Sequence, residues 1–242
     1  MLKLILSVCL FTSSFHVVAQ TTDASTSQSV QNAFQNLTAT GNYSGASLPI
    51  FGHKEDTKGS RYLFEHWVNG YAVNNKNITI NVVGYAFNYD KINSSLLVTT
   101  DKRSCIEVAN ADLNSFVLTD DERSYSFVHL PFINPKVFFI EIEKDAAKYA
   151  LYKLIKTKFI KSNYHNDGLT ESGNNYDEYA DETEYYIVFP GGTSFKKIEL
   201  KKKSIKEVFA AENAKVDSYF SQHKNDDFTE NYLKGLVQFL NK

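Results

Sequence analysis

Apolar and polar residues alternate with a period of two over much of the range 61–200. The alternation is clearest at 78–82, 138–143 and 197–201, where β-branched or aromatic residues are interleaved with polar or charged ones. Successive side chains of a β-strand point to opposite faces of its sheet, so this period predicts strands with one buried face and one face in water. A sheet is therefore the expected main element of the fold.

Further strand candidates follow one another at spacings of about 8 to 12 residues, separated by turn-forming Asn, Asp and Gly. They cover 61–64, 85–89, 95–99, 105–108, 116–118, 125–130 and 185–189. This spacing leaves no room for the helical crossovers that a parallel sheet needs. We expect an α+β fold that is mainly β, with an antiparallel meander or barrel-like sheet.

The segment 145–161 fits two patterns. Its aliphatic residues lie on a helical stripe flanked by five lysines, which would give a basic amphipathic helix able to lie on a membrane surface. Several of its residues, such as Tyr152, Ile155 and Phe159, are aromatic or β-branched and favour a strand. We predict a strand here.

The C-terminal residues 204–242 have a helical pattern that should pack on the sheet. Ser204 and Glu207 have the spacing of a capping box, which predicts a helix that begins at Ser204. A second helix is predicted after residues 225–227, with one apolar stripe over 232–240. Together with the sheet, these helices would complete a single domain over residues 60–242.

Residues 1–19 have the pattern of an export signal. Lys3 precedes a short apolar run at 4–11, and small residues precede a cleavage point after Ala19. The eight-residue run is too short for a membrane-spanning helix, and Val8 is the wrong residue ahead of a lipoprotein Cys9. We predict a protein of the periplasm, cell envelope or extracellular space, with no transmembrane segment after cleavage.

Residues 20–59 are rich in Thr, Ser, Gln, Asn and Gly and form a polar lead-in that we expect to be partly disordered. Cleavage after Ala19 would leave Cys105 as the single cysteine, and its flanking residues predict a half-buried strand. A small buried hydrophobe is therefore a better interpretation than a nucleophile.

Motifs for enzymatic chemistry are absent from the sequence. We find no phosphate-binding Gly-rich loop, paired-Cys zinc pattern or nucleophile elbow, and the histidines have no metal-ligand spacing. The histidines after the predicted cleavage point are His53, His66, His129, His165 and His223. We therefore predict no catalytic, cofactor-binding or metal-binding residue and no cofactor.

The segment Asn163–Glu184 carries seven carboxylates and no lysine or arginine. Carboxylates at this density are able to hold calcium, but a solvated acidic loop or, given its three tyrosines, a recognition loop are the alternatives. Because turn formers dominate, we predict that residues 165–182 can be replaced by a short turn without unfolding the domain. The lysines at 196–206 fit a solvated strand face better than a nucleic-acid site, because no arginine lies among them.

Five stretches of the chain resemble a family of uncharacterised exported proteins of Bacteroidota bacteria. They are KGSRYLFEHWV at 58–68, FNYDKI at 87–92 with Leu96 and Leu97, YALYKLIKTKF at 149–159, FKKIELKKKSIKEVF at 195–209 and SYFSQHK at 218–224. The resemblance implies a strand at 149–159 and residence in the periplasm or at the cell envelope. It implies no catalytic residue.

Two function classes remain. The first is a non-enzymatic envelope protein that binds a ligand or a protein partner through its sheet or through the loop 163–184. The second is a glycan or peptide hydrolase that uses carboxylates of that loop as acid and base. The first is favoured, because paired carboxylates catalyse when their pKa values are driven apart, and an exposed loop does this poorly.

Overall fold

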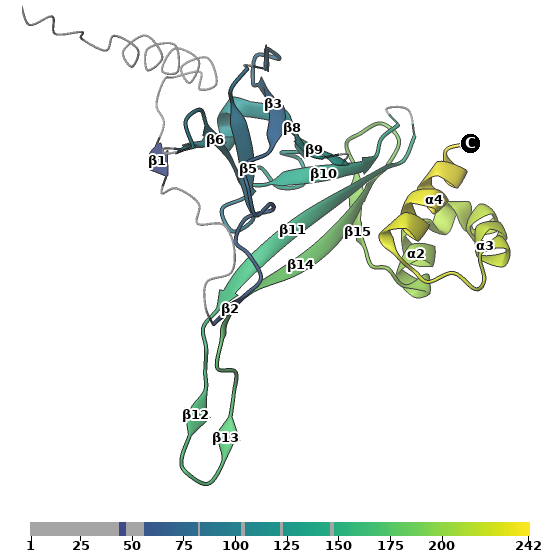
Figure 1. Cartoon of the computed structure of the whole chain (residues 1–242). Coiled ribbons are helices and arrows are strands. Elements are labelled where there is room, and N and C mark those ends of the chain that lie inside the picture. The colour runs from purple at the N-terminus through teal and green to yellow at the C-terminus, as the bar shows by residue number, and fades with distance from the viewer. Residues whose placement is uncertain (1–43, 47–55, 82, 103–104, 122, 146–147) are drawn as a thin grey trace, which may run out of the picture.

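The computed structural model of the chain describes residues 44–46, 56–81, 83–102, 105–121, 123–145 and 148–242 (Figure 1). The fold is mainly β with helices at the C-terminus, which confirms the predicted class. The predicted export signal at 1–19 and most of the predicted lead-in at 20–59 lie outside the described residues. No helix among the described residues has the length and apolar character needed to cross a membrane.

A smaller sheet has the order β1-β7-β6-β5, with all pairs antiparallel. Its strands are β1 (Ser44–Ala46), β5 (Ala86–Asp90), β6 (Ser95–Thr99) and β7 (Cys105–Val108). All five residues of β6 are buried, so this strand lacks the solvated face that an alternating pattern implies.

A larger sheet has the order β15-β14-β11-β10-β9-β8-β3-β4. Its strands are β3 (Asn69–Asn74), β4 (Thr79–Ile80), β8 (Leu113–Asp120), β9 (Arg123–His129), β10 (Phe138–Glu143), β11 (Ala150–Ile160), β14 (Asp177–Val188) and β15 (Phe195–Ile198). These neighbours are antiparallel, but β2 (Thr57–Lys58) adds a parallel pair on β14, so the sheet is mixed. Its order is open, since β15 and β4 are not paired with each other in the described part of the chain.

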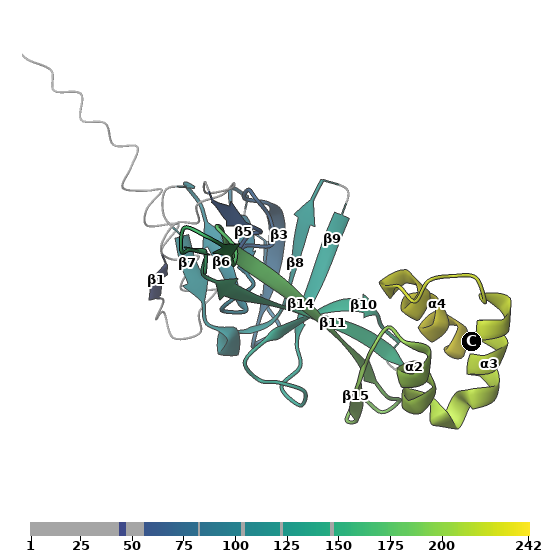
Figure 2. The ribbon, with the colours of Figure 1, turned by 90° about the horizontal axis from the view of Figure 1, so that it is seen from below.

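The smaller sheet packs on β3, β8, β9 and β10 of the larger one, and we call this two-layer unit the body (Figures 1 and 2). Aromatic rings fill the space between the layers. Phe116 stacks on Phe127 with ring centroids 4.5 Å apart, and Tyr89 from the other layer lies 4.6 Å from Phe127. All three rings are fully buried, so each contributes a large apolar area to the stability of this unit.

The strand predicted at 61–64 is wrong. This segment is irregular and has one isolated bridge, between Tyr62 and Asp90. Its polar backbone is satisfied by the buried Asn88, whose amide nitrogen donates to the carbonyls of Phe64 (2.9 Å) and His66 (3.0 Å). Two backbone hydrogen bonds, from the Leu63 amide to the Tyr89 carbonyl and from the Lys91 amide to the Arg61 carbonyl (both 3.0 Å), add to these side-chain contacts without forming a regular ladder.

The C-terminal region contains α2 (Lys202–Val208), a 3-10 turn at Ala210–Glu212, α3 (Asn213–Gln222) and α4 (Glu230–Leu240). The predicted stripe of α4 is confirmed, because its five apolar residues are all buried. The predicted capping box is wrong. Helix α2 begins two residues earlier, and the Ser204 hydroxyl instead accepts a hydrogen bond from the amide of Glu199 (2.9 Å).

The helices pack on one face of β11, β14 and β15, around a cluster that includes Leu151, Ile187 and Leu236. The opposite face of these strands holds a smaller cluster with Phe139 and Tyr152. Phe139 was expected on the wet face of its strand and is fully buried instead, because this part of the sheet is covered on both sides.

Candidate binding site on the hairpin arm

Strands β11 and β14 form a long hairpin that runs from the helices, past the body and out into solvent (Figures 1 and 2). They share eleven consecutive pairs, from Ala150 with Val188 to Ile160 with Glu178. The strand predicted within 145–161 is confirmed, and the alternative of an amphipathic helix is wrong. We call residues 159–178 the arm. At its end, β12 (His165–Asn166) and β13 (Glu171–Ser172) form a two-stranded ladder.

The loop predicted at Asn163–Glu184 is correct only in part, because residues 177–184 belong to β14. Their acidic side chains are compatible with a strand because lysines of β11 lie opposite. Lys158 Nζ lies 3.1 Å from a Glu182 oxygen, and Lys156 Nζ lies 2.8 Å from a Glu184 oxygen. Opposite charges across an antiparallel pair stabilise the pairing where aliphatic contacts are lacking.

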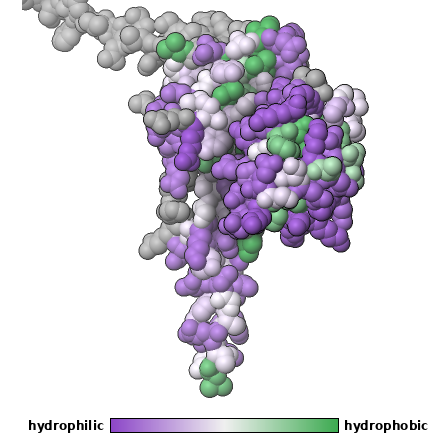
Figure 3. Space-filling model, turned by 90° about the vertical axis from the view of Figure 1, so that its right-hand side faces the viewer, coloured by the Kyte–Doolittle hydropathy of each residue, from purple (hydrophilic) through white to green (hydrophobic). Residues whose placement is uncertain are grey.

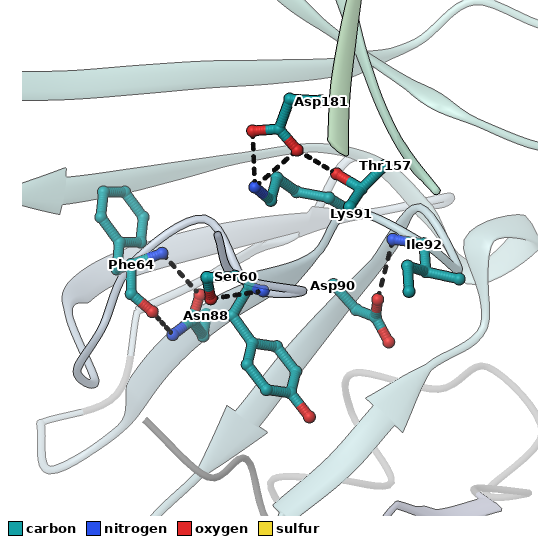
Figure 4. Close-up of polar contacts among 9 residues, drawn as sticks. Ser60, Phe64, Asn88, Asp90, Lys91, Ile92, Thr157 and Asp181 are labelled. Carbon is teal, nitrogen blue, oxygen red and sulfur yellow. Dashed lines mark hydrogen bonds and ion pairs between the residues drawn. The ribbon is translucent and has the colours of Figure 1, made fainter. Parts of the chain in front are cut away.

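The hairpin is tied to the body next to the arm by Lys91, in the turn after β5 (Figure 4). Lys91 is only 7% exposed, and its Nζ lies 2.8 Å and 2.7 Å from the two carboxylate oxygens of Asp181 on β14. The hydroxyl of Thr157 on β11 donates to the same carboxylate. A buried cation paired in this way fixes where the hairpin leaves the body.

The turn that holds Lys91 is itself fixed by the buried Asp90. One of its carboxylate oxygens accepts two hydrogen bonds from Arg61, at 2.9 Å and 2.6 Å, and the other accepts the amides of Ile92 and Asn93. Sequence patterns did not reveal this contact, because Lys91 and Asp181 are ninety residues apart and no local pattern links them.

On the other face of the hairpin, Glu184 is 8% exposed and accepts hydrogen bonds from three side chains. Lys156 (2.8 Å), Lys197 of β15 (2.7 Å) and the hydroxyl of Tyr186 (2.7 Å) donate to it. Burial alone would raise the pKa of this carboxyl, but the three donors outweigh burial and lower the pKa to about 2. Glu184 is therefore an anion that joins three strands.

The outer end of the arm has a defined conformation. The Asp167 carboxylate accepts hydrogen bonds from the amides of Leu169 (2.9 Å) and Thr170 (2.7 Å). Gly168, which follows Asp167, has a left-handed φ of +83°. At Gly173 a side chain would be impossible, because a Cβ would lie 2.3 Å from the carbonyl oxygen of Asn163. These contacts hold the chain in one tight turn without support from the body.

This turn presents apolar side chains to solvent. Leu169 is 93% exposed, and Figure 3 shows the apolar end of the arm beyond the body. Tyr164, Phe159 and Ile160 are also exposed along the arm. Single exposed apolar residues are ordinary on proteins, but an exposed leucine at the end of a hydrogen-bonded projection is suited to contact with another molecule.

The acidic residues of 163–184 are not gathered into one cluster in the described part of the chain. Among the described residues, no three or more His, Cys, Asp or Glu side chains are grouped so that they would hold a metal ion. The backbone amides that Asp167 accepts lower its pKa, and the pKa of Glu184 is lowered as well. A general acid requires the opposite direction of shift.

The remaining candidate residues lie apart from the arm or have local contacts. Cys105 is a buried side chain of β7, and burial raises the pKa of its thiol, so the interpretation as a small hydrophobe is confirmed. His66 contacts Asp120 (3.0 Å), and His223 contacts Asp226 (2.9 Å). His129 contacts a backbone carbonyl, His165 lies in β12, and His53 lies outside the described residues.

Comparison with protein-family models, with curated proteins and with solved structures found no match for this chain. The functional interpretation of the arm therefore depends on its own residues and geometry.

Proposed function

We propose that this chain is an exported protein of the periplasm or cell envelope that binds a protein partner, without catalysis, through the arm at residues 159–178. The observation that carries the proposal is the 93% exposure of Leu169 at the end of a turn fixed by its own hydrogen bonds. Full burial of a leucine side chain against a partner contributes about 1.5–3 kcal/mol.

The fixed conformation of the arm supports this proposal. A disordered loop loses conformational entropy when it binds, whereas a preformed turn loses little. The contact of Lys91 with Asp181 fixes the hairpin next to the arm, and the hydrogen bonds of Asp167 fix the turn at the arm's outer end. Tyr164 and Phe159 add aromatic surface, which is common at the centre of protein interfaces.

Export is supported by the charged start, the short apolar run and the small residues before position 20. The resemblance to exported proteins of Bacteroidota points to the same compartment. N-terminal sequencing of the protein isolated from its cells should give a chain that begins at Gln20. A chain that begins at Met1, or at a lipidated Cys9, would contradict export by this route.

Site-specific photo-crosslinking in the cells that make the protein tests the binding role. A crosslinker at Leu169 should capture one discrete protein, to be identified by mass spectrometry, whether a second copy or a different chain. The control is a crosslinker at Ile78, which is 55% exposed on the body. Equal crosslinking from both positions, or no protein adduct at Leu169, would show that the arm is not a binding element.

A further inference from the structure

A second charged surface lies at the far edge of the larger sheet, in residues 195–206, which we call the basic edge. It comprises β15, the following turn and the first residues of α2, and it carries six lysines and one glutamate. Among the described residues, no carboxylate lies within 4.0 Å of the amino groups of Lys196 and Lys202. Both lysines are exposed, and their amino groups lie over aromatic rings, that of Lys196 5.7 Å from the centroid of Phe189 and that of Lys202 5.6 Å from the centroid of Phe220.

Apolar surface lies at the same edge of the sheet but on the other face of β15, because Lys196 pairs with Ile187 of the helix-covered face and Phe195 pairs with Val188 of the opposite face. Phe195 of β15 is 37% exposed and Phe132 is 42% exposed, and their rings make an edge contact with centroids 6.1 Å apart. The basic edge therefore carries cationic side chains on one face of β15 and, on the other face, an aromatic surface on which an aliphatic side chain can be buried.

The arm has the complementary composition. It carries the carboxylates of Asp167, Glu171, Asp177 and Glu178 against the single Lys161, and Leu169 projects from its end. Within the described part of the chain, none of these four carboxylates lies within 4.0 Å of a lysine, arginine or histidine nitrogen. Their charges are thus not neutralised by the arm's own fold.

We propose that the arm of one copy docks on the basic edge of a second copy, so that the chain forms a two-fold dimer. This inference depends on the proposed function and names its partner. Within one molecule the arm and β15 with α2 point to different sides, as both ribbon views show (Figures 1 and 2). A two-fold axis midway between the arm's end and the basic edge exchanges the two, so the same contact forms twice.

Forming the contact twice is what makes the dimer stable. One arm end is small, but once the first contact has formed, the second becomes intramolecular and gains from a high effective concentration. Opposite charges steer the two copies together, and Leu169 against Phe132 and Phe195 supplies the apolar part. Because the charges are exposed, salt should weaken the dimer.

Sedimentation velocity of the protein isolated from its cells tests this. We expect dimers at 50 mM NaCl, with a dissociation constant at least about tenfold higher at 500 mM NaCl. An arm variant, Glu171→Lys with Glu178→Lys, and an edge variant, Lys196→Glu with Lys202→Glu, should each be monomeric. An equimolar mixture of the two should form mixed dimers, because the exchanged positions of the arm and of the edge carry opposite charges again in one contact and the other contact is that of the wild type. A control, Lys224→Glu with Lys234→Glu away from both surfaces, should stay dimeric.

A wild-type protein that stays monomeric at 50 mM NaCl up to about 0.2 mM would overturn the dimer, as would a mixture that stays monomeric. A dimer lost in the arm variant but kept in the edge variant would overturn the docking surface. Circular dichroism melts confirm that each variant is folded. If the protein is monomeric while Leu169 still crosslinks to a different protein, the dimer fails and the proposed function stands. If neither self-association nor a crosslink occurs, both fail.

Discussion

The body and the hairpin of β11 and β14 are both built from antiparallel strand pairs, yet they are stabilised differently. In the body, Phe116, Phe127 and Tyr89 are fully buried between two layers. In the outer half of the hairpin, the corresponding positions hold lysines and carboxylates that pair across the strands, such as Lys158 with Glu182. A strand pair can therefore extend beyond the hydrophobic core when charged pairs across the strands stabilise it in place of buried side chains.

The two kinds of stabilisation differ in size and in their response to solution conditions. Burial of a large side chain contributes about 1.5–3 kcal/mol and does not depend on pH or salt in this range. A cross-strand charged pair contributes about 0.2–1 kcal/mol and is screened by salt. Substitutions along the hairpin should therefore have effects that decrease from its inner end at the helices to its outer end.

The largest effect is expected at Ile187, which is fully buried where the hairpin meets the helices. Ile187→Asp should lower the free energy of unfolding by several kcal/mol, because a carboxylate buried without a partner is costly against a typical stability of about 5–15 kcal/mol. Urea unfolding measures the change. Ile78→Asp, at a position 55% exposed, is the control and should change stability by less than about 1 kcal/mol. Equal effects would mean that Ile187 is not packed under the helices.

An intermediate, pH-dependent effect is expected at Glu184. Its pKa in the folded protein is about 2, below the ordinary value of 4.5, so its anion stabilises the fold above pH 4.5 and this contribution is lost as the pH falls towards 2. Glu184→Gln should lower the stability by about 1–2 kcal/mol at pH 7, a range that allows for screening of the partly exposed Lys156 and Lys197.

The difference between wild type and this variant should shrink between pH 4.5 and pH 2, as measured by urea unfolding at each pH. Glu182→Gln, at an exposed carboxylate that pairs with Lys158, should show almost no difference at any pH. A wild-type advantage that persists unchanged at pH 2 would contradict the role of the Glu184 anion.

The smallest effect is expected at the end of the arm. Replacement of residues 162–176 by an Asn-Gly turn keeps all eleven pairs of β11 with β14 and should change stability by no more than about 1 kcal/mol, because loop closure entropy varies slowly with length. A thermal melt tests this. The deletion predicted from the sequence, 165–182, would instead remove six residues of β14 and the partner of Lys91. If the shorter replacement unfolds the protein, the arm contributes to the fold as well as to binding.

The class of fold could be predicted because alternation marks strands whose two faces differ. The alternation failed where both faces are buried, as at Phe139, and where polar residues occupy both faces, as at residues 177–184. Strand β3 (Asn69–Asn74) was missed because its Asn and Gly residues suggest a turn. Gly70 is required there by close packing, since a Cβ would lie 2.3 Å from the carbonyl oxygen of Val117.

The candidate site was only partly predictable. The acidic character of residues 163–184 could be read from composition. The groups that fix the arm could not, because Lys91 reaches Asp181 only after the sheet has formed, and Ser204 is used by Glu199 in place of a capping box. Such contacts depend on tertiary geometry, which local patterns do not contain.

The continuity of β11 and β14 from the helices to the arm also has a mechanical consequence. A pull on the end of the arm acts along both strands in the same direction, away from β10 and β15, which flank them at the other end. The hydrogen bonds of these flanking pairs lie across that direction, so they are loaded in shear and together, whereas bonds that are peeled apart break one after another. A tethered molecule would thus be held by a projection whose anchorage resists tension along its length.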